Sequence, residues 1–316
     1  MSSDSLPGKT ARVVGDWARH AMWYMARLFW GCLPQGIGYR LASLAGDIGY
    51  FAWPRGRKAA KANMARVLGY PEDHRLVALA ARHSFRNYCR YMVDFLRFSR
   101  LTPQEIEHRV VFDDWAQFDA ALADGRGAIF VGMHMGNWDL AAAAIAQRNY
   151  RVNVIVERQR PPALDRYIKQ TREALGMKLI PLESATGGIV RALRRNEILA
   201  LLIDRPSPDD GVPVSFFGAT AHVPAGAALL SLRTGASVVA GALVRLPNDA
   251  FLGLLRRVEP APPSGDASSD IQALTQNIMH ALEEMVRPYP EQWYMFRRLW
   301  TTPPLPLVES SLRQPT

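Results

Sequence analysis

His134 and Asp139 lie five positions apart in "GMHMGNWDL", residues 132–140, directly after an apolar run. This spacing does not place two side chains on one face of a helix, where neighbours lie three or four residues apart, or on one face of a strand. The two can therefore meet only where the chain bends, and Gly136 permits a tight bend. An imidazole beside a carboxylate is the arrangement of a general base. A simpler interpretation also fits the spacing, in which Asp139 only caps the next helix.

Charged pairs follow two further apolar runs. Glu157 and Arg158 come after "VNVIV", and Asp204 and Arg205 come after "ILALLI". Because the carboxyl ends of parallel strands share one edge of a sheet, where such sheets bind ligands, we expect these side chains to converge near His134. Each pair taken singly also fits the termination of a strand by solvated charge.

The sequence lacks several well-known catalytic motifs. It has no GxSxG serine elbow, no Walker A loop, no HExxH motif and no cluster of cysteines. What remains is a base with a carboxylate partner, and arginines that can bind phosphate or an oxyanion. We therefore expect no protein nucleophile, no metal and no cofactor.

Short apolar runs alternate with helical segments after residue 112. Strands are predicted at 127–133, 152–157, 178–182, 198–204 and 237–244. Helices are predicted between them at 138–147, 163–175, 185–195 and 224–233. This alternation is typical of an α/β fold with a mostly parallel central sheet flanked by helices. A last strand at 251–258 follows the short loop "LPNDA", which favours antiparallel addition, and a last helix is predicted at 271–287.

The first part of the chain is predicted to be helical and basic. Helices are expected at 11–31, 36–52, 57–68 and 73–97. Residues 1–70 carry ten Lys or Arg against three acidic residues, together with four of the eight tryptophans. Basic residues interleaved with aromatic ones suit the surface of a membrane with anionic lipid, with nucleic acid as the rival partner. We expect an N-terminal helical, membrane-surface part at 1–110, an α/β core at 111–302 and a loose tail at 303–316.

The same composition indicates where the protein works. The most apolar N-terminal stretch is interrupted by Arg27 and ended by Pro34, so it is too short to span a bilayer, and no clear secretory signal is present. Two cysteines that lie far apart favour a reducing compartment. We therefore expect the protein to stay on the cytoplasmic side, at the surface of a membrane.

Four blocks in order resemble one known family. "GMHMGNWDL", "VERQRPPALD", "LLIDRPSPDDGVPVSFFG" and "VPAGAALLSLRTGA" look like the bacterial lipid A lauroyl/myristoyl acyltransferases and the phosphatidylinositol mannoside acyltransferases, which share the HxxxxD motif. The likeness runs from about residue 15 to residue 300. The segment "PEQWYMFRRLW" departs from the lipid A members, so the resemblance leaves open whether the acceptor is a phosphatidylinositol mannoside-like glycolipid or a lipid A precursor.

The resemblance implies an O-acyltransferase that is bound peripherally to the cytoplasmic face of the bacterial inner membrane, and it assigns roles to residues. His134 is implied to be the general base, Asp139 to orient it, and Glu157 to belong to the catalytic set. The donor is an acyl thioester, either acyl-CoA or an acyl group on acyl carrier protein, and the acceptor is a glycolipid hydroxyl; no nucleic acid is expected. Substrate-binding residues are expected to be Asn137, Arg158, Asp204, Arg205, Phe216, Phe217 and Gly218. Two alternatives remain: a catalytically silent lipid- or nucleic-acid-binding protein on the same fold, and an acyl-thioester hydrolase.

Overall fold

The fold is described from a computed structural model of the chain. It describes residues 25, 28–159, 162–207 and 209–300. The helix expected at 11–31 lies almost wholly outside these residues, and so does the tail at 303–316. The division of the chain into parts at 1–110, 111–302 and 303–316 stays a prediction.

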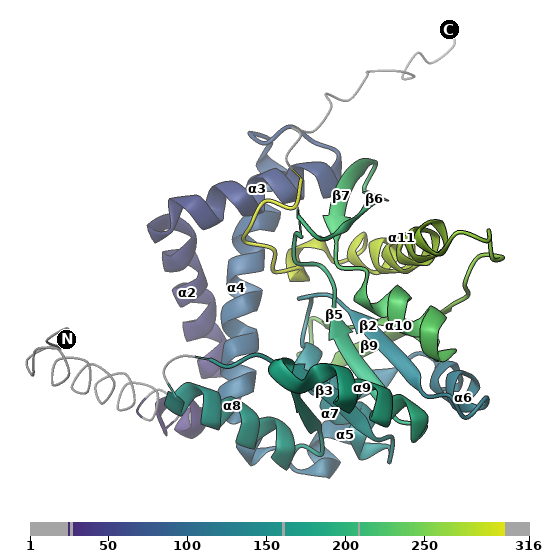
Figure 1. Ribbon diagram of the computed structural model, residues 1–316. Helices are drawn as coiled ribbons and strands as arrows, with labels where there is room; N and C mark the ends of the chain where they lie inside the picture. The colour runs from purple at the N-terminus through teal and green to yellow at the C-terminus, as the bar shows by residue number, and fades with distance from the viewer. Residues whose placement is uncertain (1–24, 26–27, 160–161, 208, 301–316) are drawn as a thin grey trace, which may run out of the picture.

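A seven-stranded sheet forms the centre of the molecule (Figure 1). Its order is β1-β9-β8-β2-β5-β3-β4, and every neighbouring pair is parallel except β8 and β9. The strands are β1 (Val110–Phe112), β2 (Ala128–Gly132), β3 (Val152–Val156), β4 (Lys178–Pro181), β5 (Ile198–Leu202), β8 (Ser237–Arg245) and β9 (Phe251–Val258). The predicted α/β class with a mostly parallel sheet is therefore confirmed, as is the antiparallel last strand.

Helices cover both faces of this sheet, as a buried parallel sheet requires. In β2 the side chains alternate: Ile129 and Val131 join one buried cluster, while Ala128 and Phe130 join the other. α10 (Gly226–Thr234) and α11 (Ala267–Val286) cover the first side, and α6 (Ala116–Leu122) and α7 (Trp138–Gln147) cover the second. α8 (Pro162–Ala174) connects β3 to β4, and α9 (Ala185–Arg194) connects β4 to β5.

Three helices from the described N-terminal part of the chain lie together on one flank of the sheet (Figure 1). They are α2 (Gln35–Ala52), α3 (Pro54–Leu68) and α4 (Arg75–Arg97), close to their expected bounds. α2 packs along α4, where Asp47 accepts hydrogen bonds from Arg82 and Arg86. α3 contacts the C-terminal segment, since the Asn63 amide donates to the carbonyl of Met295 over 2.9 Å. These helices are therefore packed against the α/β core.

Several short elements were not expected from the sequence. They are α5 (Pro103–Arg109), β1, α6, the 3-10 turns η1 (Phe98–Arg100), η2 (Leu182–Ser184) and η3 (Pro290–Gln292), and the hairpin of β6 (Val212–Phe216) and β7 (Ala219–Val223). The hairpin turns at Phe217 and Gly218, both at positive φ. α11 also begins at Ala267, four residues before its expected start, because Asp266 caps it by accepting from the Ser269 N–H. Over the described part of the chain, no helix has the length and apolar character of a membrane span.

Candidate active site

His134 and Asp204 occupy equivalent places after two neighbouring strands. β2 and β5 are parallel and in register, with Gly132 opposite Leu202, and each functional residue follows two positions later. Nδ1 of His134 lies 2.7 Å from Oδ1 of Asp204, and the backbone N–H of His134 donates to Oδ2 over 2.9 Å. The sheet thus brings an imidazole and a carboxylate together at its carboxyl edge, where ligands bind in such folds.

The Asp204 carboxylate is completely buried, with 0% of its surface exposed. Besides the two groups of His134, it accepts the indole N–H of Trp293 over 3.0 Å. Burial raises the pKa of Asp204, but the electrostatic interaction with the protonated form of His134 and the hydrogen bonds from these three donors outweigh burial, so that the pKa of Asp204 lies below its ordinary value. Asp204 is therefore an anion that faces the ring.

This arrangement determines which nitrogen of His134 can act as a base. An ionised carboxylate only accepts hydrogen bonds, so Nδ1 carries the proton that points to Asp204. Nε2 of the neutral ring then carries the free lone pair. The side chain is 22% exposed, which lets Nε2 reach a substrate. Asp204 also stabilises the imidazolium that forms once Nε2 has taken a proton.

The turn that holds His134 is bonded to two other segments. The carbonyl of His134 accepts from the N–H of Tyr294 over 2.8 Å, and the N–H of Gly136 donates to the carbonyl of Gln292 over 2.8 Å. On the other side, the N–H of Asn137 donates to the carbonyl of Leu243 in β8 over 2.9 Å. The turn is therefore held by a neighbouring strand and by the C-terminal segment.

Gly136 is required by this close approach. Its φ is +57°, and a Cβ atom there would lie 1.8 Å from the carbonyl oxygen of Leu243. Any larger residue would push the turn away from β8. The tight turn that the sequence predicted around Gly136 is therefore confirmed.

Asp139 has other partners than the histidine. It is buried in the first turn of α7, where its Oδ1 accepts from Nε of Arg172 over 2.7 Å and its Oδ2 accepts from the hydroxyl of Tyr91 over 2.8 Å. These bonds join α7 to α8 and α4. The carboxylate that binds the ring of His134 is Asp204, because the bend after β2 leads the chain into α7 while β5 ends beside β2. A catalytic role for Asp139 stays a prediction.

Glu157, Arg158 and Arg205 lie at the same edge of the sheet but at its surface. Glu157 and Arg158 follow β3, which is separated from β2 by β5. All three side chains are exposed, and Glu157 forms an ion pair of 3.5 Å with Arg205. The strand ends therefore meet as expected, with the two arginines open to solvent. The catalytic role of Glu157 and the binding roles of the arginines stay predictions.

Asn137 and the Phe216–Gly218 segment were expected to bind substrate. Asn137 is fully buried: its side-chain oxygen caps α7 by accepting the Leu140 N–H, and its amide donates to Asp94 over 3.1 Å. Phe216 is also buried and packs at 5.9 Å from the ring of Trp293, the residue that donates to Asp204. In these buried positions, Asn137 stabilises the start of α7 and Phe216 packs on Trp293. Their contact with substrate stays a prediction.

Trp293, Tyr91 and Arg172 were missed by sequence reasoning. Trp293 directly follows η3, Tyr91 lies in α4 and Arg172 lies in α8. All three are far from residue 134 in the chain. An arginine within a helix and a tryptophan near the C-terminus carry no local signal of an ion pair or of an indole donor. A further aromatic neighbour, Trp138, is visible in the motif itself, and its ring lies edge-on to His134 at 5.2 Å.

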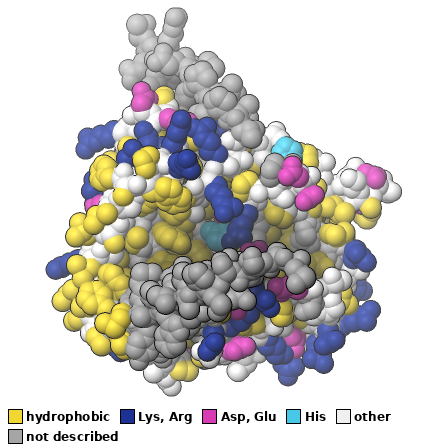
Figure 2. Space-filling view, turned by 60° about the vertical axis from the view of Figure 1, so that its left-hand side comes forward, with side chains coloured by type: hydrophobic (Ala, Val, Ile, Leu, Met, Phe, Trp, Pro, Cys, Tyr) yellow, Lys and Arg dark blue, Asp and Glu magenta, His cyan; other side chains and the backbone are white. Residues whose placement is uncertain are grey.

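One face of the molecule has a mixed character. Figure 2 shows a hollow that holds a histidine side chain beside Lys or Arg side chains, with hydrophobic side chains gathered along one flank. A hollow with apolar and cationic side chains suits a substrate with both a fatty chain and negative charge.

The comparisons with known proteins define the class to which this chain belongs. The family model described as bacterial lipid A biosynthesis acyltransferase matches residues 9–302. The chain therefore belongs to this family, and it is an acyltransferase of lipid biosynthesis.

Individual relatives carry a more specific name. A phosphatidylinositol mannoside acyltransferase of Mycobacterium tuberculosis (strain ATCC 25618 / H37Rv) is 30% identical over 299 residues, which are 92% of this chain and 89% of the relative. A protein of the same name from Mycolicibacterium smegmatis (strain ATCC 700084 / mc(2)155) is 29% identical over 300 residues, or 91% of each chain. The expected family is thereby confirmed.

Proposed function

We propose that this enzyme transfers a fatty acyl group from an acyl thioester, acyl-CoA or acyl carrier protein, to a sugar hydroxyl of a phosphatidylinositol mannoside-like glycolipid. The observation that carries the proposal is the His134–Asp204 pair, because Asp204 engages Nδ1 of the imidazole at the carboxyl edge of the sheet and, among the described residues, leaves Nε2 as the ring nitrogen without a carboxylate partner there. The names of the relatives favour this acceptor over a lipid A precursor. No metal or cofactor takes part in the proposed step.

In the proposed step, Nε2 of His134 removes the proton from the acceptor hydroxyl as its oxygen attacks the thioester carbonyl carbon. A C–O bond forms, the C–S bond breaks, and the leaving thiolate takes a proton from the imidazolium. Asp204 stays ionised throughout and stabilises the positive ring. Because a thiolate is a good leaving group, an activated hydroxyl needs no covalent acyl-enzyme.

The arginines at the edge of the sheet suit the donor. Arg158 and Arg205 are exposed at the same edge of the sheet as His134, and guanidinium groups bind phosphate oxygens through paired hydrogen bonds. Coenzyme A and the prosthetic arm of acyl carrier protein both carry phosphate at the end of the pantetheine arm that lies away from the thioester, so the arginines would bind that end while the thioester lies at His134. These two residues are therefore proposed to hold the donor, with Glu157 keeping Arg205 in place.

The membrane contact is proposed to lie on α2. Its outward face carries an apolar stripe, defined by Ile37, Leu41, Leu44, Ile48 and Phe51, whose side chains are 38 to 60% exposed. The spacing of four and three residues keeps them on one side of the helix. The exposed cations Arg40, Arg55 and Lys58 lie nearby in the chain. An apolar stripe with basic neighbours suits a peripheral helix on an anionic bilayer, and we propose the cytoplasmic face.

The proposal is tested with purified protein, labelled palmitoyl-CoA and vesicles that contain either a phosphatidylinositol mannoside or a lipid A precursor. We expect acylated phosphatidylinositol mannoside and one free thiol for each acyl group transferred. Changing His134 to Ala should lower turnover by about 10³-fold or more while the protein stays folded. Free fatty acid as the main product would identify a hydrolase, and lipid binding without any thiol release would identify a silent binding protein.

A further inference from the structure

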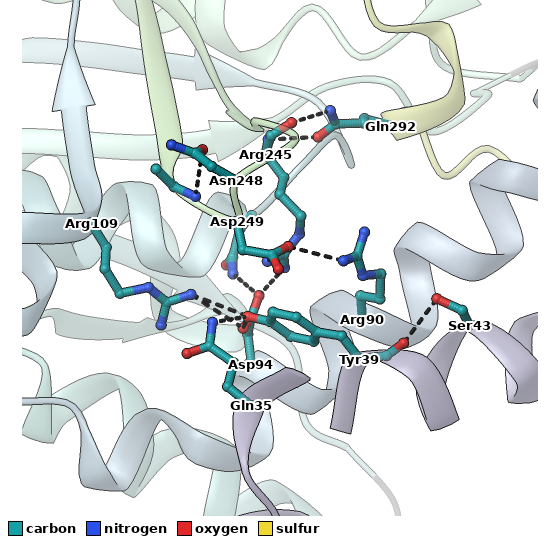
Figure 3. Close-up of polar contacts among 12 residues, drawn as sticks. Gln35, Tyr39, Ser43, Arg90, Asp94, Arg109, Arg245, Asn248, Asp249 and Gln292 are labelled. Carbon is teal, nitrogen blue, oxygen red and sulfur yellow. Dashed lines mark hydrogen bonds and ion pairs between the residues drawn. The ribbon is translucent and has the colours of Figure 1, made fainter. Parts of the chain in front are cut away.

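A buried carboxylate outside the site collects hydrogen bonds from three separate elements. Asp94 of α4 is 4% exposed. Its Oδ1 accepts from the Tyr39 hydroxyl of α2, and its Oδ2 accepts from the guanidinium of Arg245 in β8 (Figure 3). Oδ2 also accepts from the amide of Asn137. Asp94 therefore joins α2, β8 and the turn that precedes α7.

The charge of Asp94 is balanced at this place. Arg245 is itself buried and forms the ion pair, and Arg109 lies 3.9 Å from the carboxylate. Burial, followed by the negative charge of Asp94, raises the pKa of Tyr39, so its hydroxyl stays protonated and donates. The Tyr39 ring also contacts the cations, with the guanidinium carbon of Arg245 at 4.6 Å and that of Arg90 at 4.9 Å from its centre. A buried carboxylate whose two oxygens both accept hydrogen bonds, as in Asp94, is held in a single geometry.

One route leads from Asp94 directly into the catalytic turn. Asn137 lies three residues after His134, and its amide bond to Asp94 orients the side chain whose oxygen caps α7. Its backbone N–H is bonded to Leu243 of β8. The turn is thereby held at Asn137 by a side chain on one side and a strand on the other.

A second route leads from Asp94 to the partner of His134. The backbone of Arg245 makes two hydrogen bonds with the side chain of Gln292, over 2.7 and 2.8 Å. Gln292 accepts the N–H of Gly136 and directly precedes Trp293, whose indole donates to Asp204. Both members of the His134–Asp204 pair are therefore tied to the residues that Asp94 holds.

The third partner comes from the helix with the exposed apolar stripe. Tyr39 lies on the inward face of α2 with Ala42, Gly46 and Tyr50, whereas the stripe faces outward. Its hydroxyl also receives hydrogen bonds from Gln35 over 2.9 Å and Arg109 over 3.1 Å. The position of α2 is thus linked through one hydroxyl to Asp94.

We infer that Asp94 is a positioning residue for the His134–Asp204 pair: Tyr39 acts on the pair through Asp94, and Asn137 connects Asp94 to the turn that carries His134. The inference rests on the proposed function, since it concerns how the acyl-transfer site is held in place. Tyr39 and Asn137 come from different elements, and the carboxylate of Asp94 is the group that both contact. Their effects on turnover should therefore depend on each other.

The test uses two substitutions that leave the surrounding groups in place. Tyr39→Phe removes only the hydroxyl and keeps the ring between the arginines. Asn137→Ser keeps an oxygen that can cap α7 and removes the amide donor to Asp94. With palmitoyl-CoA and phosphatidylinositol mannoside vesicles, we expect each variant to lower kcat about tenfold with KM unchanged, because a small displacement of the base slows the chemical step. The double variant should lose little more than the worse single variant.

Asn153→Ser is a matched control. Asn153 is a buried asparagine at the start of β3, and its amide donates to the carboxylate of Glu197 over 2.9 Å, remote from the carboxyl edge of the sheet. We expect it to lower the melting temperature by an amount similar to Asn137→Ser while kcat for each folded molecule stays at the wild-type value. The melting temperature of every variant is measured alongside its kcat.

Two results would overturn the inference. One is a wild-type kcat for the folded Tyr39→Phe and Asn137→Ser proteins, which would make the network purely structural. The other is a double variant whose loss equals the product of the single losses, which would show that Asp94 does not couple them. The His134→Ala variant in the same assay separates the two proposals. If this variant is active, the proposed function is refuted. If it is inactive while the Tyr39→Phe and Asn137→Ser variants keep the wild-type kcat, only the positioning role of Asp94 is refuted.

Discussion

His134 and Asp204 each stand two residues beyond the end of a parallel strand, and the two strands are in register, Gly132 opposite Leu202. Their side chains meet at 2.7 Å although 70 positions separate them in the chain. The pair thus depends on the order of the strands, because β5 lies directly beside β2 whereas β3, the next strand along the chain, lies one place further away.

Replacing Asp204 by Asn tests the role of this pair. The amide keeps the shape but can donate to Nδ1, which favours the wrong tautomer of His134 and removes the charge that stabilises the imidazolium. We expect kcat to fall by about 10²- to 10⁴-fold with a smaller change in KM. Steady-state kinetics on the folded variant, verified by circular dichroism, measures this. Turnover close to that of the wild type would remove Asp204 from the mechanism.

Asp139 should show a different response, in stability more than in chemistry. Asp139→Asn leaves Arg172 without its buried counter-charge, and we expect a loss of about 3 kcal/mol in the free energy of unfolding. Adding Arg172→Gln to it should restore part of this loss, because the unpaired charge is then removed. Urea unfolding of both proteins provides the comparison. A kcat for folded Asp139→Asn as low as that of Asp204→Asn would instead assign Asp139 to catalysis.

Two glycines at positive φ offer a matched pair of substitutions. Gly136→Ala places a Cβ atom 1.8 Å from a carbonyl oxygen, whereas a Cβ at Gly218 meets nothing within 4 Å. We expect Gly136→Ala to lose at least about 3 kcal/mol of stability together with activity, since the turn must move. Gly218→Ala should lose only about 1 kcal/mol, from its backbone conformation. Equal losses in thermal unfolding would contradict the close packing of the turn on β8.

The ion pairs of Asp47 predict a dependence of stability on pH. Hydrogen bonds from Arg86 and then Arg82 hold the pKa of Asp47 well below its ordinary value of 3.8. A group whose pKa is lower in the folded state stabilises the fold above its unfolded pKa, and this contribution is lost as the pH falls through the folded pKa. Asp47→Asn should therefore be less stable than the wild type at neutral pH, and the difference should shrink as the medium becomes strongly acidic. Unfolding followed over a pH series measures it, and a difference that grows on acidification would refute it.

The apolar stripe of α2 should govern binding to lipid. Leu44→Asp and Ile48→Asp each place a charge on a face that we propose to enter the bilayer surface, and each should weaken binding to anionic vesicles roughly tenfold. Leu232→Asp on α10 is the control, because Leu232 is also exposed (41%) but lies on another helix. Vesicle sedimentation at low and high salt compares the three proteins. An equal loss for the control would show that the effect is not specific to α2.

Much of the architecture could be predicted from local patterns. The runs that became β2, β3, β5 and β8 are mainly apolar because a mostly parallel sheet covered on both faces buries most of its side chains, and the observed bounds of these strands lie within two residues of the predicted ones. Short segments such as β1 and the β6–β7 hairpin were missed, since three to five residues are too few to establish a period. β1 pairs with β9, which lies far along the chain, and the β6–β7 hairpin packs against α11.

For the site, the sequence by itself determined the kind of chemistry and the edge of the sheet at which it takes place. Residues that follow apolar strands must gather at the carboxyl edge, so His134, Glu157 and Asp204 could be placed there together. The tertiary structure alone decided which carboxylate binds the histidine. Strand order depends on the packing of whole elements, and it set Asp204 against His134 while Arg172 and Tyr91 took up Asp139. The roles of Trp293 and Asp94 likewise could not be predicted from the sequence, because a hydrogen bond between distant segments leaves no periodic or local pattern in either segment.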